Sequence, residues 1–311
     1  MRRARLAWTV AAGLILLHGP VRAAEPDWIR VSTSNLELLT TGEAASAAEA
    51  VVELESLRST FRLLPSRLPL AGTQVRIVAF SSEREYEPYR MNSFSPAYFV
   101  DGPGRLTIVL GRLAKENFPS LRHEYVHSLI RMRGWNLPLW LEEGLAEHFA
   151  GVSGETARMR SKRLTRGGLL ALEALAAATR DSDSYTLRED ALRFYGQSWA
   201  LVDLLLTHPG YRGAAYEYID RCAAGADCVG LMPVVFARST ADIERDLRDH
   251  VQRLRAGRLD DSPGDSIVET APASGLEVKA ALSEIRTVLD GGVLIAAAPA
   301  QLRTSPSLPA R

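Results

Sequence analysis

The chain has 311 residues, 46% of them hydrophobic and 24% charged, as in an ordinary globular protein. Lys plus Arg and Asp plus Glu both total 37, so the formal net charge is zero. Nucleic-acid-binding proteins usually show a basic excess or a basic stripe, and electrostatic membrane anchors show a run of like charges. The sequence has neither, so we expect no nucleic-acid partner and no anchor of that kind.

The first 23 residues have the pattern of a secretory signal peptide. Three Arg residues among the first five precede the apolar stretch 6–17, and Val21 and Ala23 supply the small residues that precede a cleavage site. The apolar stretch is shorter than the ~20 residues that a membrane-spanning helix needs. We therefore predict cleavage after residue 23, a periplasmic or secreted mature protein and no stable membrane span. A retained anchor is the alternative.

Apolar periodicity predicts an α+β protein, with a small N-terminal mixed sheet and its helices followed by a mainly helical half. The predicted strands are 28–39, 74–80 and 105–110, with an amphipathic helix at 42–64 and a loop at 86–103. The later predicted helices are 121–133, 140–149, 169–178, 191–207, 211–224 and 239–255.

The residue composition of the chain changes after residue 255. Gly, Pro and Asp residues predict a linker at 257–265, and apolar spacing predicts one more helix at 276–289. The Ser- and Pro-rich end, 301–311, is predicted to be a disordered tail. We therefore divide the chain into a signal peptide (1–23), a main domain (24–255) and a C-terminal extension (256–311).

The segment around residue 123 contains His-Glu-x-x-His on a predicted helix: His123, Glu124 and His127. Residues i and i+4 of a helix share one face, so both imidazoles can reach one zinc ion about 2.0–2.1 Å from each nitrogen. Glu124 then points toward a water in the open coordination position and can accept its proton as general base.

A second acidic cluster follows across a short turn. A catalytic zinc needs three protein ligands, and a Glu on a second helix can supply the third. The segment 139–148, entered through Pro138, carries Glu142, Glu143 and Glu147. Neighbouring helix residues point about 100° apart, so only one of the first two should face the metal.

The two motifs together resemble the gluzincin (thermolysin-like) superfamily of zinc metallopeptidases. The resemblance rests on His-Glu-x-x-His paired with Trp-Leu-x-Glu-Gly-x-Ala-Glu, and it covers roughly residues 28–255. A Tyr-x-x-Ser-Trp-Ala-Leu-Val pattern at 195–202 is similar to one in exported bacterial members. The resemblance implies a thermolysin-like helical half and one zinc ion.

By motif, the resemblance implies that Glu143 is the third zinc ligand, which would leave Glu142 as a solvated surface acid. It implies that Glu147 accepts a hydrogen bond from a zinc-bound histidine, for which we expect His123. It further implies a donor to the oxyanion from the following helical region. Tyr195 is the first candidate and Tyr185 a weaker one, and a core tyrosine is the alternative for Tyr195.

The resemblance also implies that the strand 105–110 is an edge strand that pairs with an extended substrate. Two motifs are missing: Gly-x-Met-Glu-Asn, which binds the substrate's amino terminus in related aminopeptidases, and the Gly of the metzincin motif, where this chain has Ile130. An exopeptidase is therefore unsupported, and a metzincin is excluded. We read His148, His208 and His250 as structural or exposed.

The only cysteines, Cys222 and Cys228, are expected to form a disulfide in an oxidising compartment, with two free thiols as the alternative. We expect the whole chain to be an exported zinc peptidase that acts on a peptide or protein substrate, as an endopeptidase. A non-catalytic binding or scaffold protein on the same fold is one alternative. A zinc hydrolase that cleaves another amide bond is a second alternative.

Overall fold

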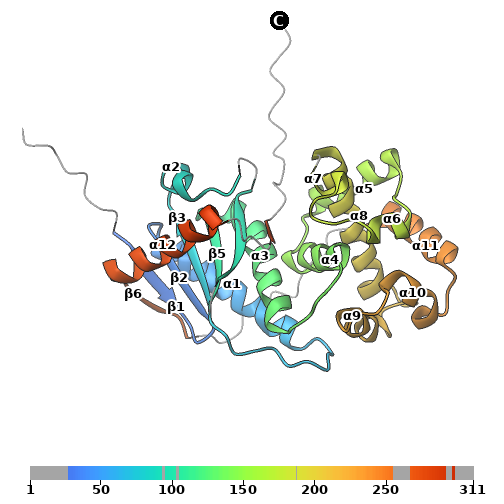
Figure 1. The fold of residues 1–311 in the computed structure, drawn as a ribbon, viewed down its shortest axis with the longest axis horizontal. Coiled ribbons are helices and arrows are strands. Elements are labelled where there is room, and N and C mark those ends of the chain that lie inside the picture. Colours follow the sequence, from blue (N-terminus) through green and yellow to red (C-terminus); the bar gives the residue numbers. More distant parts are fainter. Residues whose placement is uncertain are drawn as a thin grey trace, which may run out of the picture.

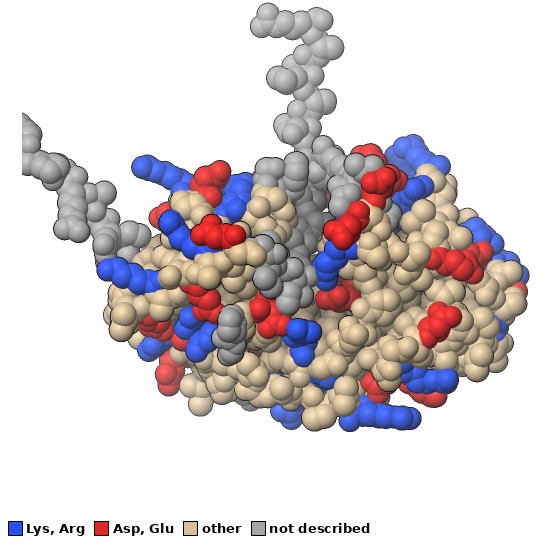
Figure 2. Space-filling model, viewed as in Figure 1, with Lys and Arg blue, Asp and Glu red and all other residues tan. Residues whose placement is uncertain are grey.

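The computed structural model describes residues 27–92, 95–102, 105–186, 188–254, 267–291 and 296–297. The predicted signal peptide, the linker at 257–265 and the tail at 301–311 lie outside the described residues. Among the described residues, no helix has the length and hydropathy needed to cross a membrane. Acidic and basic side chains are interspersed on the face shown in Figure 2.

One mixed sheet forms the first half of the structure (Figure 1). Its strands, in the order β6-β1-β2-β3-β5-β4-β7, are β6 (Glu269–Pro272), β1 (Ile29–Ser32), β2 (Leu36–Thr40), β3 (Val75–Phe80), β5 (Arg105–Arg112), β4 (Ala97–Gly102) and β7 (Ala296–Ala297). β3 runs parallel to β2 and β5, and the other neighbours are antiparallel. The α+β prediction is therefore confirmed.

Helices cover both faces of the sheet. Successive side chains of a strand point to opposite sides, so each strand contributes to two separate cores. Ile77 and Ile108 belong to the core beneath α1 (Ala44–Arg62) and α3 (Phe118–Met132). Val78 and Val109 belong to a second core with Ile285 of α12 (Gly275–Gly291). The sheet thus holds α3, the helix of the His-Glu-x-x-His motif, against its first face.

The second half is helical and packs around the long helix α8 (Arg188–Thr207), which contacts α4, α5, α7 and α11. Its other helices are α4 (Leu139–Ala150), α5 (Gly154–Gly167), α6 (Leu172–Ala176), α7 (Asp183–Thr186), α9 (Ala215–Ala223), α10 (Cys228–Phe236) and α11 (Thr240–Arg253). Figure 1 shows α4 between α3 and this group. Cys222 and Cys228 form a disulfide between α9 and α10, with their Cα atoms 5.3 Å apart, within the usual range.

A tight turn folds α4 back against α3. Gly134 follows the end of α3 with a φ of +70°, a conformation that glycine adopts without steric cost. Pro138 then precedes the first turn of α4 in extended conformation. The sequence prediction placed the end of one helix and the start of the next at these two residues. The turn sets the acidic face of α4 beside the histidines of α3.

Several predicted boundaries were wrong. The strand predicted at 28–39 is two strands, β1 and β2, that form a hairpin. β4 lies inside the predicted loop at 86–103, as do the end of α2 (Glu83–Tyr86) and η1 (Glu87–Tyr89). α5 and α10 were not predicted, and neither were β6 and η2 (Lys115–Asn117). The helix predicted at 276–289 is α12, and β6 adds the preceding segment to the sheet beside β1.

The prediction that 105–110 is an edge strand was also wrong. β5 pairs with β3 on one side and with β4 on the other, so neither side of its backbone is open to a substrate. The error follows from the missed strand β4. Because residues 86–103 were predicted to be a loop, no strand was expected on the side of β5 where β4 pairs. The outer strand beside the helical half is therefore β4, and its outer side pairs with β7.

Candidate metal centre

Two histidines of α3 and one glutamate of α4 bring three metal-binding atoms together. His123 Nε2 and His127 Nε2 lie 3.1 Å apart, and Glu143 Oε2 lies 3.2 Å from the first and 3.5 Å from the second. All three side chains are buried, and they could hold a metal ion. These are the three residues that the sequence analysis named as ligands, and the structure gathers them into one cluster.

The geometry of the cluster fits a small cation. Three donors ~2.05 Å from one ion at tetrahedral angles lie about 3.3 Å from each other. The observed separations, 3.1 to 3.5 Å, agree with that value. In addition, Glu143 Oε2 is buried and accepts no hydrogen bond from the described residues, although buried carboxylate oxygens normally have a partner. A cation between the three atoms would satisfy this oxygen.

The outer nitrogen of each histidine ring faces a further carboxylate. His127 Nδ1 lies 3.1 Å from Glu142 Oε1, and His123 Nδ1 lies 3.5 Å from Glu147 Oε1. An Nδ1 that faces a carboxylate carries the ring proton, which leaves the lone pair of Nε2 for a metal. Both rings are therefore held in the tautomer that binds metal, and Glu147 lies beside the histidine that the sequence analysis expected.

The position of Glu142 corrects a prediction. It was expected to be a solvated surface acid, but its side chain is only 18% exposed and its Oε2 lies 3.2 Å from Arg180 Nη2. Adjacent residues of α4 point about 100° apart. Because α3 lies close to α4, the side chains of both Glu142 and Glu143 still reach the imidazole of His127. Glu143 meets the inner nitrogen of His127, and Glu142 meets the outer one.

If the cluster holds a metal ion, replacing Glu142 with Ala should lower its affinity for added zinc by about 10- to 100-fold, because the imidazole of His127 loses the carboxylate that orients it. Glu142→Gln keeps an acceptor oxygen and should lose less. Glu155→Ala, at an exposed position of α5, is the control. Titration against a chelating indicator measures the affinity. Wild-type affinity in Glu142→Ala would mean that the contact with His127 does not orient the ring.

The contacts of Glu147 extend to α5 and α8. Arg160 Nη2 lies 2.7 Å from Glu147 Oε2, and the guanidinium lies over the ring of Trp199, 5.3 Å from its centroid. Arg160 belongs to α5, the helix that the sequence analysis missed. Ser153 caps this helix by accepting a hydrogen bond from Thr156 N, a signal that the sequence did offer.

Tyr185 is closer to the metal-binding residues than Tyr195. Its hydroxyl donates to Glu143 Oε1 at 3.1 Å, which leaves Oε2 of the same carboxylate for the histidines. Tyr195 is 5% exposed, and its ring centroid lies 5.6 Å from that of Tyr185. The structure thus brings both tyrosines to the site, and Tyr185, the weaker candidate, makes the direct contact. The catalytic role of Tyr195 stays a prediction.

Burial and charge act in opposite directions on the cluster. Burial would raise the pKa of Glu143, but its close contacts with His127 and His123 hold that pKa well below the ordinary value. Burial would lower the pKa of His127, but the nearby carboxylates of Glu143 and Glu142 raise it well above the usual range. The carboxylate of Glu143 therefore stays ionised although it is buried, and an ionised buried carboxylate is a group that a bound cation would stabilise.

Close packing of α8 against α4 fixes the backbone next to Glu143. A Cβ on Gly144 would lie 2.6 Å from the carbonyl oxygen of Ser198 and 2.6 Å from Val202 Cγ2, so only glycine fits. Ser198 and Val202 belong to the Tyr-x-x-Ser-Trp-Ala-Leu-Val segment noted in the sequence. Gly144, which follows Glu143, and this segment of α8 therefore form the two sides of one helix contact.

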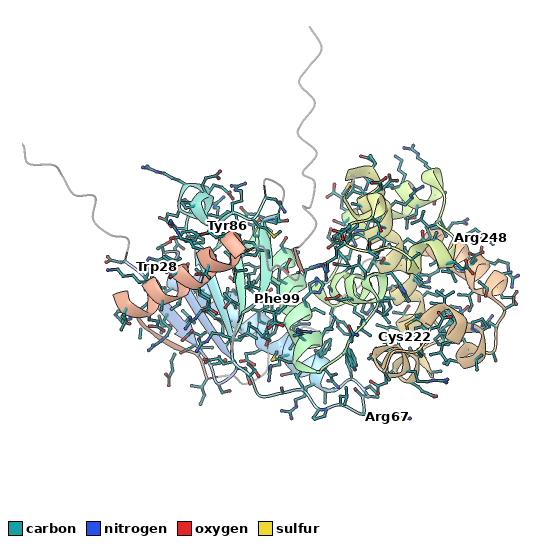
Figure 3. All side chains as sticks on the ribbon, viewed as in Figure 1. Trp28, Arg67, Tyr86, Phe99, Cys222 and Arg248 are labelled. Atoms are coloured by element: carbon teal, nitrogen blue, oxygen red, sulfur yellow. A yellow bond between two sulfur atoms is a disulfide. The ribbon has the colours of Figure 1, made fainter. Side chains whose placement is uncertain are left out.

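Two hollows of the surface reach the cluster. One is lined by His127, Glu142 and Arg180 together with Phe99 of β4, and the other by His123 and Glu147. Figure 3 shows Phe99 where the sheet meets α3. Glu124, the residue after His123 on α3, is fully buried. The cluster therefore lies between the sheet and the helical half, and one of the two hollows reaches it from the side of β4.

The remaining histidines with described partners lie apart from the cluster. His148 Nδ1 and His250 Nε2 lie 3.2 and 2.8 Å from the two carboxylate oxygens of Asp203, which joins α4, α8 and α11. Burial would raise the pKa of Asp203, but the two imidazoles hold it well below its ordinary value. The structural role expected for His148 and His250 agrees with these contacts.

A scan against protein-family models found no match to this chain, and a search of curated proteins found none. The cluster of His123, His127 and Glu143 is therefore the feature of this chain that points to a function.

Proposed function

We propose that this chain is a zinc-dependent peptidase of the gluzincin kind, exported and acting on peptide or protein substrates. The observation that carries the proposal is the convergence of His123 Nε2, His127 Nε2 and Glu143 Oε2, with a carboxylate behind each imidazole. Two imidazoles and one carboxylate are a ligand set of catalytic zinc sites, and three protein ligands leave a coordination position open.

Zinc in this position would supply Lewis acidity and lower the pKa of a bound water. Glu124 is the residue of this chain that would handle the proton. Its carboxylate would accept a proton from the water that attacks the peptide carbonyl, and it would then pass that proton to the amine nitrogen that leaves. A purely structural zinc site would have no use for a glutamate at this place.

The other residues around the cluster would hold its geometry during this reaction. Tyr185 fixes the orientation of Glu143, and Glu142 and Glu147 fix the two imidazoles. Arg180 and Phe99 line the hollow beside His127 and would border the substrate. Tyr195 would supply a hydrogen bond to the oxyanion if a substrate displaced its contact with Tyr185.

Hydrolysis of fluorescein-labelled casein tests this proposal. The mature protein loaded with zinc should cleave casein, a phenanthroline chelator should abolish the cleavage, and added zinc should restore it to at least about half of its starting rate. The non-chelating phenanthroline isomer is the control. Zinc-loaded protein that cleaves neither casein nor a library of quenched peptides would contradict the proposal and favour a binding protein on this fold.

A further inference from the structure

The chain's own C-terminal segment covers the outer side of β4. β7 is antiparallel to β4, with Ala297 opposite Tyr98 and Ala296 opposite Phe99. The other side of β4 pairs with β5, so β7 completes the backbone pairing of these two residues. β7 also lies against α3, and Figure 1 shows it as a short dark red segment beside that helix.

The strand that β7 covers borders the metal centre. Phe99 lines the same hollow as His127 and Arg180. Asp101, further along β4, accepts a hydrogen bond from Arg131 Nε of α3 at 2.6 Å, which fixes the strand beside the helix that carries both histidines. A chain that pairs with the outer side of β4 is therefore held alongside the metal-binding helix.

The path of the chain explains how β7 reaches this place. α12 packs over the face of the sheet that holds Tyr98 and contacts β4, where a Cβ on Gly102 would lie 2.8 Å from Glu284 Oε1. Only residues 292–295 separate the end of α12 from Ala296. A tether this short gives the segment an effective concentration near β4 of the order of millimolar.

We propose that the segment carrying Ala296 and Ala297 is an intramolecular competitor of substrate: it occupies the strand position on β4 in which an extended peptide binds, and it limits access to the metal centre. This inference rests on the proposed function. Two residues that pair through their backbone contribute few hydrogen bonds, each of which adds little net stability in exchange with water. A longer peptide that pairs with more of β4 and also fills the hollow at Phe99 displaces them.

The test compares two variants of the full mature chain that differ in whether residues 296 and 297 carry backbone N–H groups. Ala296→Pro with Ala297→Pro removes both N–H groups, and Ala296→Ser with Ala297→Ser keeps them. The first readout is hydrogen exchange of the segment 97–102 by mass spectrometry. The proline variant should exchange at least about tenfold faster than wild type at the amide that faces β7, and the serine variant should match wild type.

The second readout is binding of fluorescein-labelled casein, measured by anisotropy with all variants in a Glu124→Gln background, so that no turnover is needed. The proline variant should bind about three to ten times more tightly than the serine variant. The inference would be overturned if the proline and serine variants exchanged the amides of 97–102 at the same rate, or if they bound casein with the same affinity. Tighter binding by the proline variant, together with no casein cleavage by the zinc-loaded wild type, would uphold the inference and contradict the peptidase proposal.

Discussion

Replacement of Glu124 by Gln will lower kcat for casein hydrolysis by about a thousandfold and leave the zinc content unchanged, since a general base contributes roughly 10²–10⁴ to the rate. Gln has nearly the same volume as Glu and fits the same buried position on α3, but its amide cannot accept the proton of the attacking water. His123, His127 and Glu143 are untouched by the change. The effect should therefore appear in kcat rather than in metal binding.

The measurement is steady-state hydrolysis of a quenched peptide derived from casein, with zinc content determined on the same samples. Glu155→Gln is the matched control, because it makes the same chemical change at an exposed position of α5. It should retain the wild-type kcat. If Glu124→Gln kept more than about a tenth of the wild-type kcat with full zinc content, Glu124 would not be the general base.

Replacement of Gly144 by Ala will lower the free energy of unfolding by about 2 to 3 kcal/mol, as overpacking at a helix contact does. The added methyl group meets the carbonyl oxygen of Ser198, which belongs to the backbone of α8 and cannot rotate away. The helices must separate, and Glu143 moves with α4. We therefore also expect the affinity for zinc to fall by at least about tenfold, in line with the sensitivity of metal sites to ligand orientation.

Gly196→Ala in α8 is the matched control. The nearest atoms to a Cβ there would be those of Leu164, at 3.7 Å or more, which is ordinary contact. This variant should unfold at the same or a higher denaturant concentration than wild type, with a gain of up to about 1 kcal/mol from the reduced freedom of the unfolded chain. Urea unfolding of both variants and of the wild type measures these changes in the free energy of unfolding. Equal stability of the two would show that α4 and α8 are not in close contact at Gly144.

The inner part of the site was predictable because it depends on helix geometry. The spacing of His123 and His127 puts both rings on one face, and the turn between Gly134 and Pro138 returns a second helix at short range. The role of Glu142 was not predictable in this way. Its direction relative to His127 depends on how closely α4 approaches α3, and that distance is set by tertiary packing around Gly144.

The errors in the fold have similar causes. β4 has a short apolar run at Ala97 to Val100, which fits a strand buried on both faces, but the prolines at 96 and 103 flank it and suggested a loop. Without β4, the neighbouring strand β5 was taken for an edge. α5 was missed because it is strongly polar and buries only two of its described residues, Ala157 and Leu164, so it offers few apolar positions from which a helix can be predicted.

The zinc stoichiometry of the mature protein, determined by elemental analysis after dialysis against a weak chelator, shows whether His123, His127 and Glu143 hold a metal. We expect one zinc per wild-type chain and an affinity at least about a hundredfold lower in His127→Gln, since a catalytic zinc needs three protein ligands. Absence of zinc from the wild type after incubation with the metal, or equal zinc in His127→Gln, would contradict this expectation.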